Sequence, residues 1–250
     1  MNPKVYAEQL RKANSEKIAI APLREAIGND VDIAYAIQNI NTAFKIDNGA
    51  RVIGKKIGLT SIAVQKQLGV DQPDFGILFN DMEVLNGLSI SMQNLMQPKV
   101  EAEIAFVLAE DLDLPNLTTI DILDAIDYAL PAIEIVGSRI SNWDIKIADT
   151  IADNASASHF VIGHSPKTLD EFDVVHCKMH MTKNGVVSSE GTGAACLGSP
   201  LNATLWLAKK MIALGTPLQA GELIFSGALG PMVTVEAGDK LEAHFENLGR

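Results

Sequence analysis

VEAEIAFVL, residues 100–108, carries two carboxylates inside a run that otherwise has the pattern of a buried strand. Side chains alternate between the two faces of a strand, so Glu101 and Glu103 point to the same face. Glutamate is rarely fully buried unless it is paired or binds a metal, and two adjacent carboxylates repel each other. A positive group is therefore expected between them, unless these side chains lie on a solvated face of the sheet.

A second apolar run, LPAIEIV at residues 130–136, contains a third carboxylate, Glu134. Three carboxylates on two strands predict a divalent metal site. Ligands that are all oxygen suit a hard cation, Mg²⁺ or Mn²⁺, better than zinc or copper. Few protein ligands also leave coordination positions open for water or a chelating substrate.

Charge and composition exclude several kinds of partner. The chain has 250 residues and a formal net charge of −11, which argues against nucleic acid and anionic membranes. A bound cation can still reverse the local field and admit a small anionic substrate. Two cysteines, Cys177 and Cys196, provide no disulfide framework, and no signal peptide or run of 18 apolar residues is evident. These features predict a soluble, cytoplasmic protein.

The pattern of elements predicts an α+β fold. Residues 1–50 are expected to form a helical N-terminal lead-in, with helices at 3–15 and 31–47, and residues 51–250 a single catalytic unit dominated by strands. A capping box from Thr118 to Asp121 predicts a helix through about residue 129. The Asn184-Gly185 pair predicts a hairpin turn. The absence of a strict strand–helix alternation favours a rolled, mixed sheet over a doubly wound one.

Other kinds of chemistry have weaker support in the sequence. GTGAAC at residues 191–196 lacks the third glycine of a dinucleotide-binding loop, and no serine stands in a G-x-S-x-G frame. His176 and His180 would share one face of a strand and Cys177 the other, so the three cannot converge on one metal.

Lys56 and Asp74 are candidates for acid–base chemistry. Lys56 lies in VIGKKIGLT, residues 52–60, where glycines within a strand indicate close approach of a ligand or of another backbone segment. The alternative is an ordinary surface lysine. Asp74, in QPDFG, would by itself be interpreted as a residue that favours a turn.

Taken together, these segments resemble the 2-hydroxypenta-2,4-dienoate (2-keto-4-pentenoate) hydratases of the fumarylacetoacetate hydrolase superfamily. The resemblance follows the chain in order through GKKIGLTS (54–61), QPDFG (72–76), QPKVEAEIA (97–105), PAIE (131–134), SRI (138–140) and ADNAS (152–156). It implies a barrel-like mixed β-roll with flanking helices, a Mg²⁺ or Mn²⁺ site, and a homo-oligomer, often a pentamer or decamer.

The resemblance also implies roles for individual residues. The implied metal ligands are Glu101, Glu103 and Glu134, and the implied acid–base pair is Lys56 and Asp74. The implied contacts of the substrate pocket are Ser156, Leu78, Ser226 and Gly227.

The implied reaction is addition of water to a small anionic 2-hydroxydienoate during breakdown of aromatic compounds. The main alternative is 2-oxo-3-hexenedioate (4-oxalocrotonate) decarboxylase, which shares the metal carboxylates and the ADNAS segment. Asp74 and the turn SGALGPM, residues 226–232, favour the hydratase. A third possibility is a non-catalytic partner subunit, since such hydratases can associate with the cognate decarboxylase.

Overall fold

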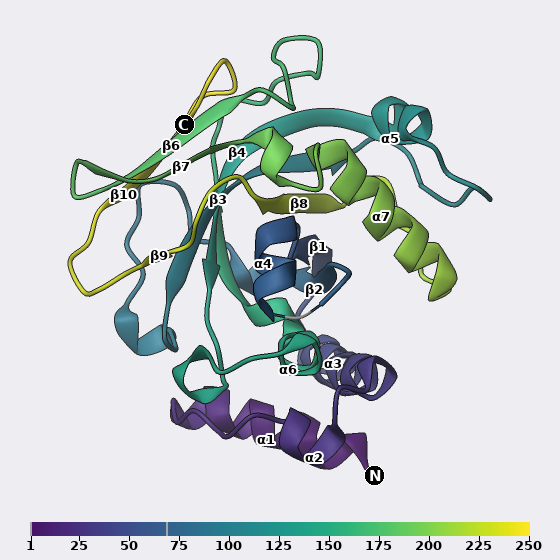
Figure 1. Ribbon diagram of the computed structural model, residues 1–250, viewed down its shortest axis with the longest axis vertical. Helices are drawn as coiled ribbons and strands as arrows, with labels where there is room; N and C mark the ends of the chain where they lie inside the picture. The colour runs from purple at the N-terminus through teal and green to yellow at the C-terminus, as the bar shows by residue number, and fades with distance from the viewer. Residues whose placement is uncertain (1, 69) are drawn as a thin grey trace.

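The computed structural model describes residues 2–68 and 70–250, and a curved, mixed sheet lies at its centre (Figure 1). In spatial order the strands of this sheet are β2 (Asp74–Phe79), β1 (Val52–Gly58), β8 (Leu223–Ala228), β3 (Lys99–Leu108), β4 (Ile126–Val136) and β5 (Ala157–Ile162), with the short β9 (Val233–Thr234) paired to β3. The β1–β8 pair is parallel and the other pairs are antiparallel. The predicted mixed sheet is therefore confirmed.

The long β3–β4 ladder forms the middle of this sheet. Ile104, Ala105 and Phe106 follow one another in β3 and are all fully buried, so both faces of the strand are covered. The register pairs Glu101 directly with Glu134 of β4. Glu101 and Glu103, at alternate positions of β3, therefore lie on the strand next to the one that carries Glu134.

A second sheet contains β10 (Leu241–Phe245), β6 (Lys178–Lys183) and β7 (Val186–Thr192). Asn184 and Gly185 connect β6 to β7 with φ angles of 56° and 79°, which confirms the predicted hairpin turn. β6 begins at Lys178, so the expectation that His176 and His180 share one strand was wrong. Residues before Lys178 form turns, which leaves His176 outside the strand.

The N-terminal helices α1 (Pro3–Glu16), α2 (Arg24–Ile27) and α3 (Val31–Asp47) lie at one end of the molecule (Figure 1). Asn2 and Asp30 accept hydrogen bonds from the first turns of α1 and α3. α3 packs against α6 (Ile147–Ala152), and Tyr35 stacks on Phe75 of β2 with ring centroids 4.8 Å apart. The N-terminal helices therefore share the hydrophobic core of the sheet.

The remaining helices are α4 (Ile62–Leu68), α5 (Thr119–Ala125) and α7 (Pro200–Ala213). The Thr118–Asp121 capping box is present, but α5 ends at Ala125 rather than near residue 129. The reason is that β4 starts at Ile126 and pairs with the last residues of β3. α7 packs against α5 and β8. Among the described residues, no helix has both the length and the apolar character needed to cross a membrane.

Short 3₁₀ turns complete the chain between these elements. They are Asn80–Met82, Met92–Asn94, Ser141–Trp143, Asn154–Ser156 and Gly193–Ala195.

Candidate functional site

Three carboxylates converge where β3 meets β4. Glu101, Glu103 and Glu134 each offer an oxygen, and these oxygens all lie within 4.8 Å of one another. Glu103 and Glu134 are 0% exposed, whereas Glu101 is partly exposed and lines a cavity of about 580 Å³. The sequence prediction that these three residues lie together is borne out by their geometry.

Several oxygens of this cluster lack a donor. The backbone N–H of Gly227 donates to Oε2 of Glu103 at 2.8 Å. No N–H or hydroxyl group of the described residues donates to Oε1 of Glu103 or to Oε1 of Glu134. A buried carboxylate oxygen without a partner is strongly unfavourable. Oxygen-only donors in this arrangement fit a hard divalent cation.

The electrostatics of the cluster support the same conclusion. Burial raises the pKa of Glu101 to about 7, against the opposing effect of the Lys56 ammonium. Burial, followed by the charges of Glu134 and Glu101, raises the pKa of Glu103 well above its ordinary value. Burial also raises the pKa of Glu134, which Lys56 opposes. Without a cation, burial makes all three groups bind a proton more readily than an exposed glutamate does, and a divalent ion would oppose this effect.

Lys56 lies on β1, beside this cluster. Its Nζ is 3.1 Å from Oε2 of Glu134 and donates to the carbonyl oxygen of Ala155 at 3.0 Å. Lys56 is 3% exposed. Burial acts to lower the pKa of the ammonium, but the surrounding carboxylates, with Glu134 first, outweigh it and raise the pKa. Lys56 is therefore a buried ammonium held among carboxylates, not a surface lysine.

Asp74, at the start of β2, shares the cavity with Lys56. Thr150 of α6 donates a hydrogen bond to Oδ2 of Asp74, while Oδ1 receives no donor from the described residues. Burial raises the pKa of Asp74, and Lys56 and Thr150 oppose this effect. A Cβ on Gly58 would lie 2.2 Å from Oδ1 of Asp74 and 3.4 Å from Nζ of Lys56. Glycine at that position leaves the space in which the two groups approach.

The cavity is lined by both polar and apolar residues. Lys56, Asp74, Glu101 and Ser156 are among the polar ones, and Ser156 is 5% exposed. The apolar lining residues include Val64, Val136, Trp143, Ile145, Leu229, Pro231 and Met232. Such a cavity suits a small molecule with one charged end and one hydrocarbon end.

The other predicted pocket residues occupy different places. Leu78 is buried in β2 and is not among the residues that line the cavity. Ser226 donates to the carbonyl oxygen of Ile104 at 2.7 Å, and Gly227 contacts Glu103 through its backbone. Direct substrate contact by Leu78, Ser226 and Gly227 stays a prediction.

Sequence reasoning did not identify three residues of the cavity. Thr150 orients Asp74, Lys99 lies over the ring of Trp143 with Nζ 4.6 Å from the ring centroid, and both Lys99 and Trp143 line the cavity. Lys99 precedes Glu101 by two residues, so strand alternation would have placed it on the same face. No local signal connects Thr150 to Asp74, because 76 residues separate them.

The chain is similar in sequence to a known protein family and to several known proteins. The family model described as "Fumarylacetoacetate (FAA) hydrolase C-terminal" matches residues 55–250. The chain is 53% identical over 244 residues to a 2-keto-4-pentenoate hydratase of Burkholderia vietnamiensis, covering 97% of this chain and 93% of the relative. It is 50% identical over 250 residues to 2-keto-4-pentenoate hydratase 1 of Dechloromonas aromatica, covering 100% of this chain and 95% of the relative.

A solved structure is similar over nearly the same length. It is a 4-oxalocrotonate decarboxylase from Pseudomonas putida G7, complexed with magnesium and adipate. The TM-score is 0.94 with 33% sequence identity, covering 97% of this chain and 93% of that one. The expected fold is thereby confirmed.

Proposed function

The chain belongs to the fumarylacetoacetate hydrolase family, and we propose that it is a hydro-lyase that adds water to 2-hydroxypenta-2,4-dienoate, giving 4-hydroxy-2-oxopentanoate. One observation carries the proposal: Glu103 and Glu134, whose Oε1 atoms receive no donor from the described residues, lie in one cluster with a buried Lys56, and Lys56 shares a cavity with Asp74. Relatives that are 50–53% identical and named as hydratases support the reaction. Breakdown of aromatic compounds is the setting in which this dienoate would arise.

Glu101, Glu103 and Glu134 would hold the metal, and we propose Mg²⁺ or Mn²⁺ because all three ligands are carboxylates. When bound, the ion supplies positive charge that favours an enolate oxygen on the substrate. The magnesium in the similar decarboxylase structure supports a hard ion.

Lys56 and Asp74 would perform the proton transfers. The enol O–H of the substrate is lost and C5 gains a proton, which gives a 2-oxo-3-enoate. The oxygen of water then bonds to C4, water loses one proton, and C3 gains one, so the net change is addition of one water. The carboxylates keep Lys56 in its protonated, ammonium form, and burial raises the pKa of Asp74, so its carboxyl group takes up a proton more readily than an exposed aspartate does. These two groups are the proposed acid–base pair.

Ser156 and the apolar lining of the cavity would orient the substrate. Ser156 lines the cavity, and its hydroxyl group would donate to a carboxylate or 2-oxygen of the substrate. The hydrocarbon end of the dienoate would pack against Val136, Trp143 and Ile145. Lys99 at the same wall would attract the anionic substrate into this acidic chain.

The similarity to the decarboxylase structure makes decarboxylation of 2-oxo-3-hexenedioate the second candidate. Sequence identity favours the hydratase, at 50–53% against 33%. A non-catalytic subunit has less support, because all three carboxylates, Lys56 and Asp74 are present in one site.

The test is an assay of the purified chain with each substrate. We expect loss of the ultraviolet absorbance of 2-hydroxypenta-2,4-dienoate in the presence of Mg²⁺ or Mn²⁺, and abolition of that loss by EDTA. Release of carbon dioxide from the dienedioate, without hydration of the dienoate, would instead identify a decarboxylase. Inactivity toward both substrates with metal present would leave the partner-subunit alternative.

Assembly is a separate part of the proposal. We propose a homo-oligomer, a pentamer or decamer, that is able to associate with a cognate decarboxylase. Size-exclusion chromatography with light scattering measures the first, and co-elution with the decarboxylase measures the second. A monomer at micromolar concentration would contradict the assembly without affecting the proposed reaction.

A further inference from the structure

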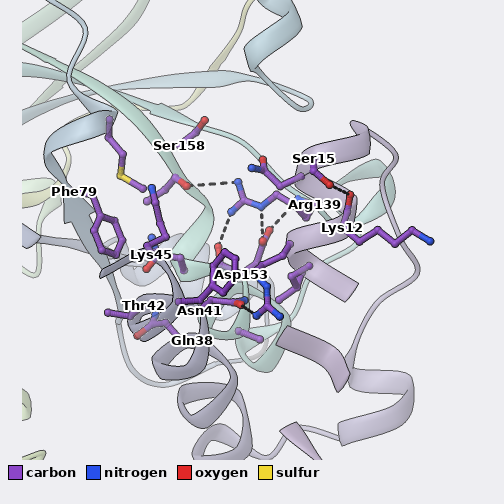
Figure 2. A pocket seen from close by; sticks show the side chains of 18 of the residues that line it. Lys12, Ser15, Gln38, Asn41, Thr42, Lys45, Phe79, Arg139, Asp153 and Ser158 are labelled. Atoms are coloured by element: carbon purple, nitrogen blue, oxygen red, sulfur yellow. Dashed lines mark hydrogen bonds and ion pairs between the residues drawn. The ribbon is translucent and has the colours of Figure 1, made fainter. Parts of the chain in front are cut away.

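A second cavity, of about 820 Å³, lies between the N-terminal helices and the sheet (Figure 2). The two cavities share a wall, residues 150–158. Thr150, Ala155 and Ser156 line the substrate cavity, while Asp153 and Asn154 line the second one. This wall is therefore positioned to hold groups of the active site.

The wall contains an unusual turn. Asn154, Ala155 and Ser156 have φ angles of 57°, 49° and 58°, so three consecutive non-glycine residues adopt the left-handed conformation. Asparagine tolerates this conformation, but alanine and serine do not favour it. Contacts from the surrounding structure must therefore hold the turn in place.

One set of contacts comes from Arg139. Its Nε donates to Oδ1 of Asp153, its Nη2 donates to the carbonyl oxygen of Asp153 at 2.7 Å, and its backbone N–H donates to Oδ2 at 2.9 Å. Figure 2 shows this pair at the inner wall of the second cavity. The Arg139 and Asp153 side chains are 9% and 3% exposed, so the pair is shielded from water.

The other set of contacts comes from the side chain of Asn154. Its Oδ1 accepts from the backbone N–H of Ile77 at 2.7 Å, and its Nδ2 donates to the carbonyl oxygen of Ile77 at 3.0 Å. A Cβ on Gly76 would lie 2.3 Å from the carbonyl oxygen of Asn154, so the turn lies against β2 without intervening side chains. The Asn154 amide therefore fastens the turn to the strand that carries Asp74.

The front of the turn meets the ammonium of Lys56. The carbonyl oxygen of Ala155 accepts a hydrogen bond from Nζ at 3.0 Å, and Glu134 lies 3.1 Å from the same nitrogen. A lysine ammonium has three N–H groups. One of them donates to Ala155, and the ion pair with Glu134 holds the nitrogen from another direction, so the location of the turn influences where the remaining N–H groups point.

We infer that Asn154 is a positioning residue: by fastening the left-handed turn to β2, it aims the Lys56 ammonium into the substrate cavity. The inference rests on the proposed function, in which Lys56 transfers protons. Asn154 itself is separated from the substrate by the turn it holds. The Arg139–Asp153 pair supports the same turn from the side of the second cavity.

The test compares Asn154→Ala and Asn154→Gly with the wild-type protein, using 2-hydroxypenta-2,4-dienoate. Glycine adopts the left-handed conformation without strain but removes the amide. We expect both variants to lose about 10- to 100-fold in kcat, because small misplacement of a reacting group has effects of this size. KM should stay within about threefold, and Mg²⁺ affinity measured with the metal alone within about twofold, since no hydrogen bond among the described residues joins the turn to the three glutamates.

Glu222→Gln is the matched control. It removes the half-buried charge that pairs with Lys55, just before β8 and outside the turn, and should lower the melting temperature without changing kcat. Wild-type kcat in Asn154→Gly would overturn the inference, because backbone conformation alone would then suffice. A loss of kcat in Glu222→Gln as large as that in the Asn154 variants would also overturn it, by showing that destabilisation in general lowers kcat.

If Asn154→Ala fails to fold, Asn154→Gly and Arg139→Lys carry the test. Failure of the wild-type protein to hydrate the dienoate would count against the proposed function instead.

Discussion

The two cavities of this protein differ in how their charges are satisfied. The larger, of about 820 Å³, contains complete pairs: Lys45 lies 3.0 Å from Asp81, and Arg139 is bound to Asp153 through several hydrogen bonds. The smaller, of about 580 Å³, is lined by Glu101 and Lys56, which lie next to Glu103 and Glu134, and the Oε1 atoms of these two receive no donor from the described residues. Cavity size therefore does not single out the proposed site. Buried carboxylates that the described residues leave without donors do, because a proton or a bound ligand must offset their energetic cost.

The largest effect is expected from removing one of the carboxylates that lack a donor beside the smaller cavity. Glu103→Gln keeps the shape but replaces a charged ligand with a neutral amide, so we expect Mg²⁺ binding to be lost and kcat/KM to fall about 10⁴-fold, equivalent to several kcal/mol of transition-state stabilisation. Isothermal titration with the metal and the dienoate assay measure the two effects.

Glu110→Gln makes the same change at an exposed position just beyond β3 and should leave both quantities unchanged. Wild-type metal affinity in Glu103→Gln would remove Glu103 from the proposed ligand set.

A second substitution separates proton transfer from metal binding in the smaller cavity. Lys56→Met removes the ammonium and should lower kcat about 10³-fold, within the range for loss of a general acid or base, while the bound metal content is retained. Metal analysis of the purified variant beside turnover measurements distinguishes the two.

Lys55→Met is the control, because Lys55 pairs with Glu222 rather than with the carboxylate cluster. It should lower stability and leave kcat near wild type. Full activity in Lys56→Met would exclude Lys56 from the proposed acid–base pair.

The pH dependence of stability and of Mg²⁺ affinity tests the role of Glu101 in the smaller cavity. The pKa of Glu101 is about 7 in the folded protein, against an ordinary value of 4.5. Its contribution to the stability of the metal-free protein is therefore fully present below pH 4.5 and is lost as the pH rises through about 7. Protons and metal compete for the same oxygens, so Mg²⁺ affinity should fall about tenfold per pH unit below pH 7. Titration calorimetry between pH 6 and 8 measures this slope. Thermal unfolding of the metal-free protein over the same pH range tests the assignment, and an unchanged pH dependence of stability in Glu101→Gln would contradict it.

The smallest effect is expected in the larger cavity. Asp81→Asn breaks the ion pair with Lys45. The Lys45 side chain is 35% exposed and the Asp81 side chain is 53% exposed. Exposed ion pairs contribute about 0–1 kcal/mol, so the melting temperature should change by only a few degrees. Hydration activity should stay within twofold of wild type. A large loss of activity would show that the second cavity takes part in the reaction. It would contradict the assignment of the chemistry to the smaller cavity.

Local pattern was sufficient to predict much of the fold. Alternation in β3 and the apolar run around Glu134 predicted two strands with carboxylates on them, and the Asn184-Gly185 pair predicted the hairpin, because each depends on neighbouring residues. The end of α5 was misplaced by about four residues, since pairing of Ile126 with β3 overrode the local helical preference. The assignment of Lys56 and Asp74 to one site came from resemblance to a family, because 17 residues and a helix separate them in sequence.

The sequence by itself determined the chemistry that is available: carboxylates at alternate positions of an apolar strand, a lysine between glycines, and an acidic chain without a membrane-spanning run. Only the tertiary structure decided how these groups are satisfied. The β3–β4 register set Glu101 opposite Glu134, and a turn about 100 residues beyond Lys56 placed the Ala155 carbonyl on its ammonium. The physical reason is that the partners of a charged residue cannot be read from its neighbours in the sequence. Burial and pairing arise from contacts between distant segments, and within the described part of the chain these contacts leave Oε1 of Glu103 and of Glu134 without a donor, while Arg139 and Asp153 satisfy each other.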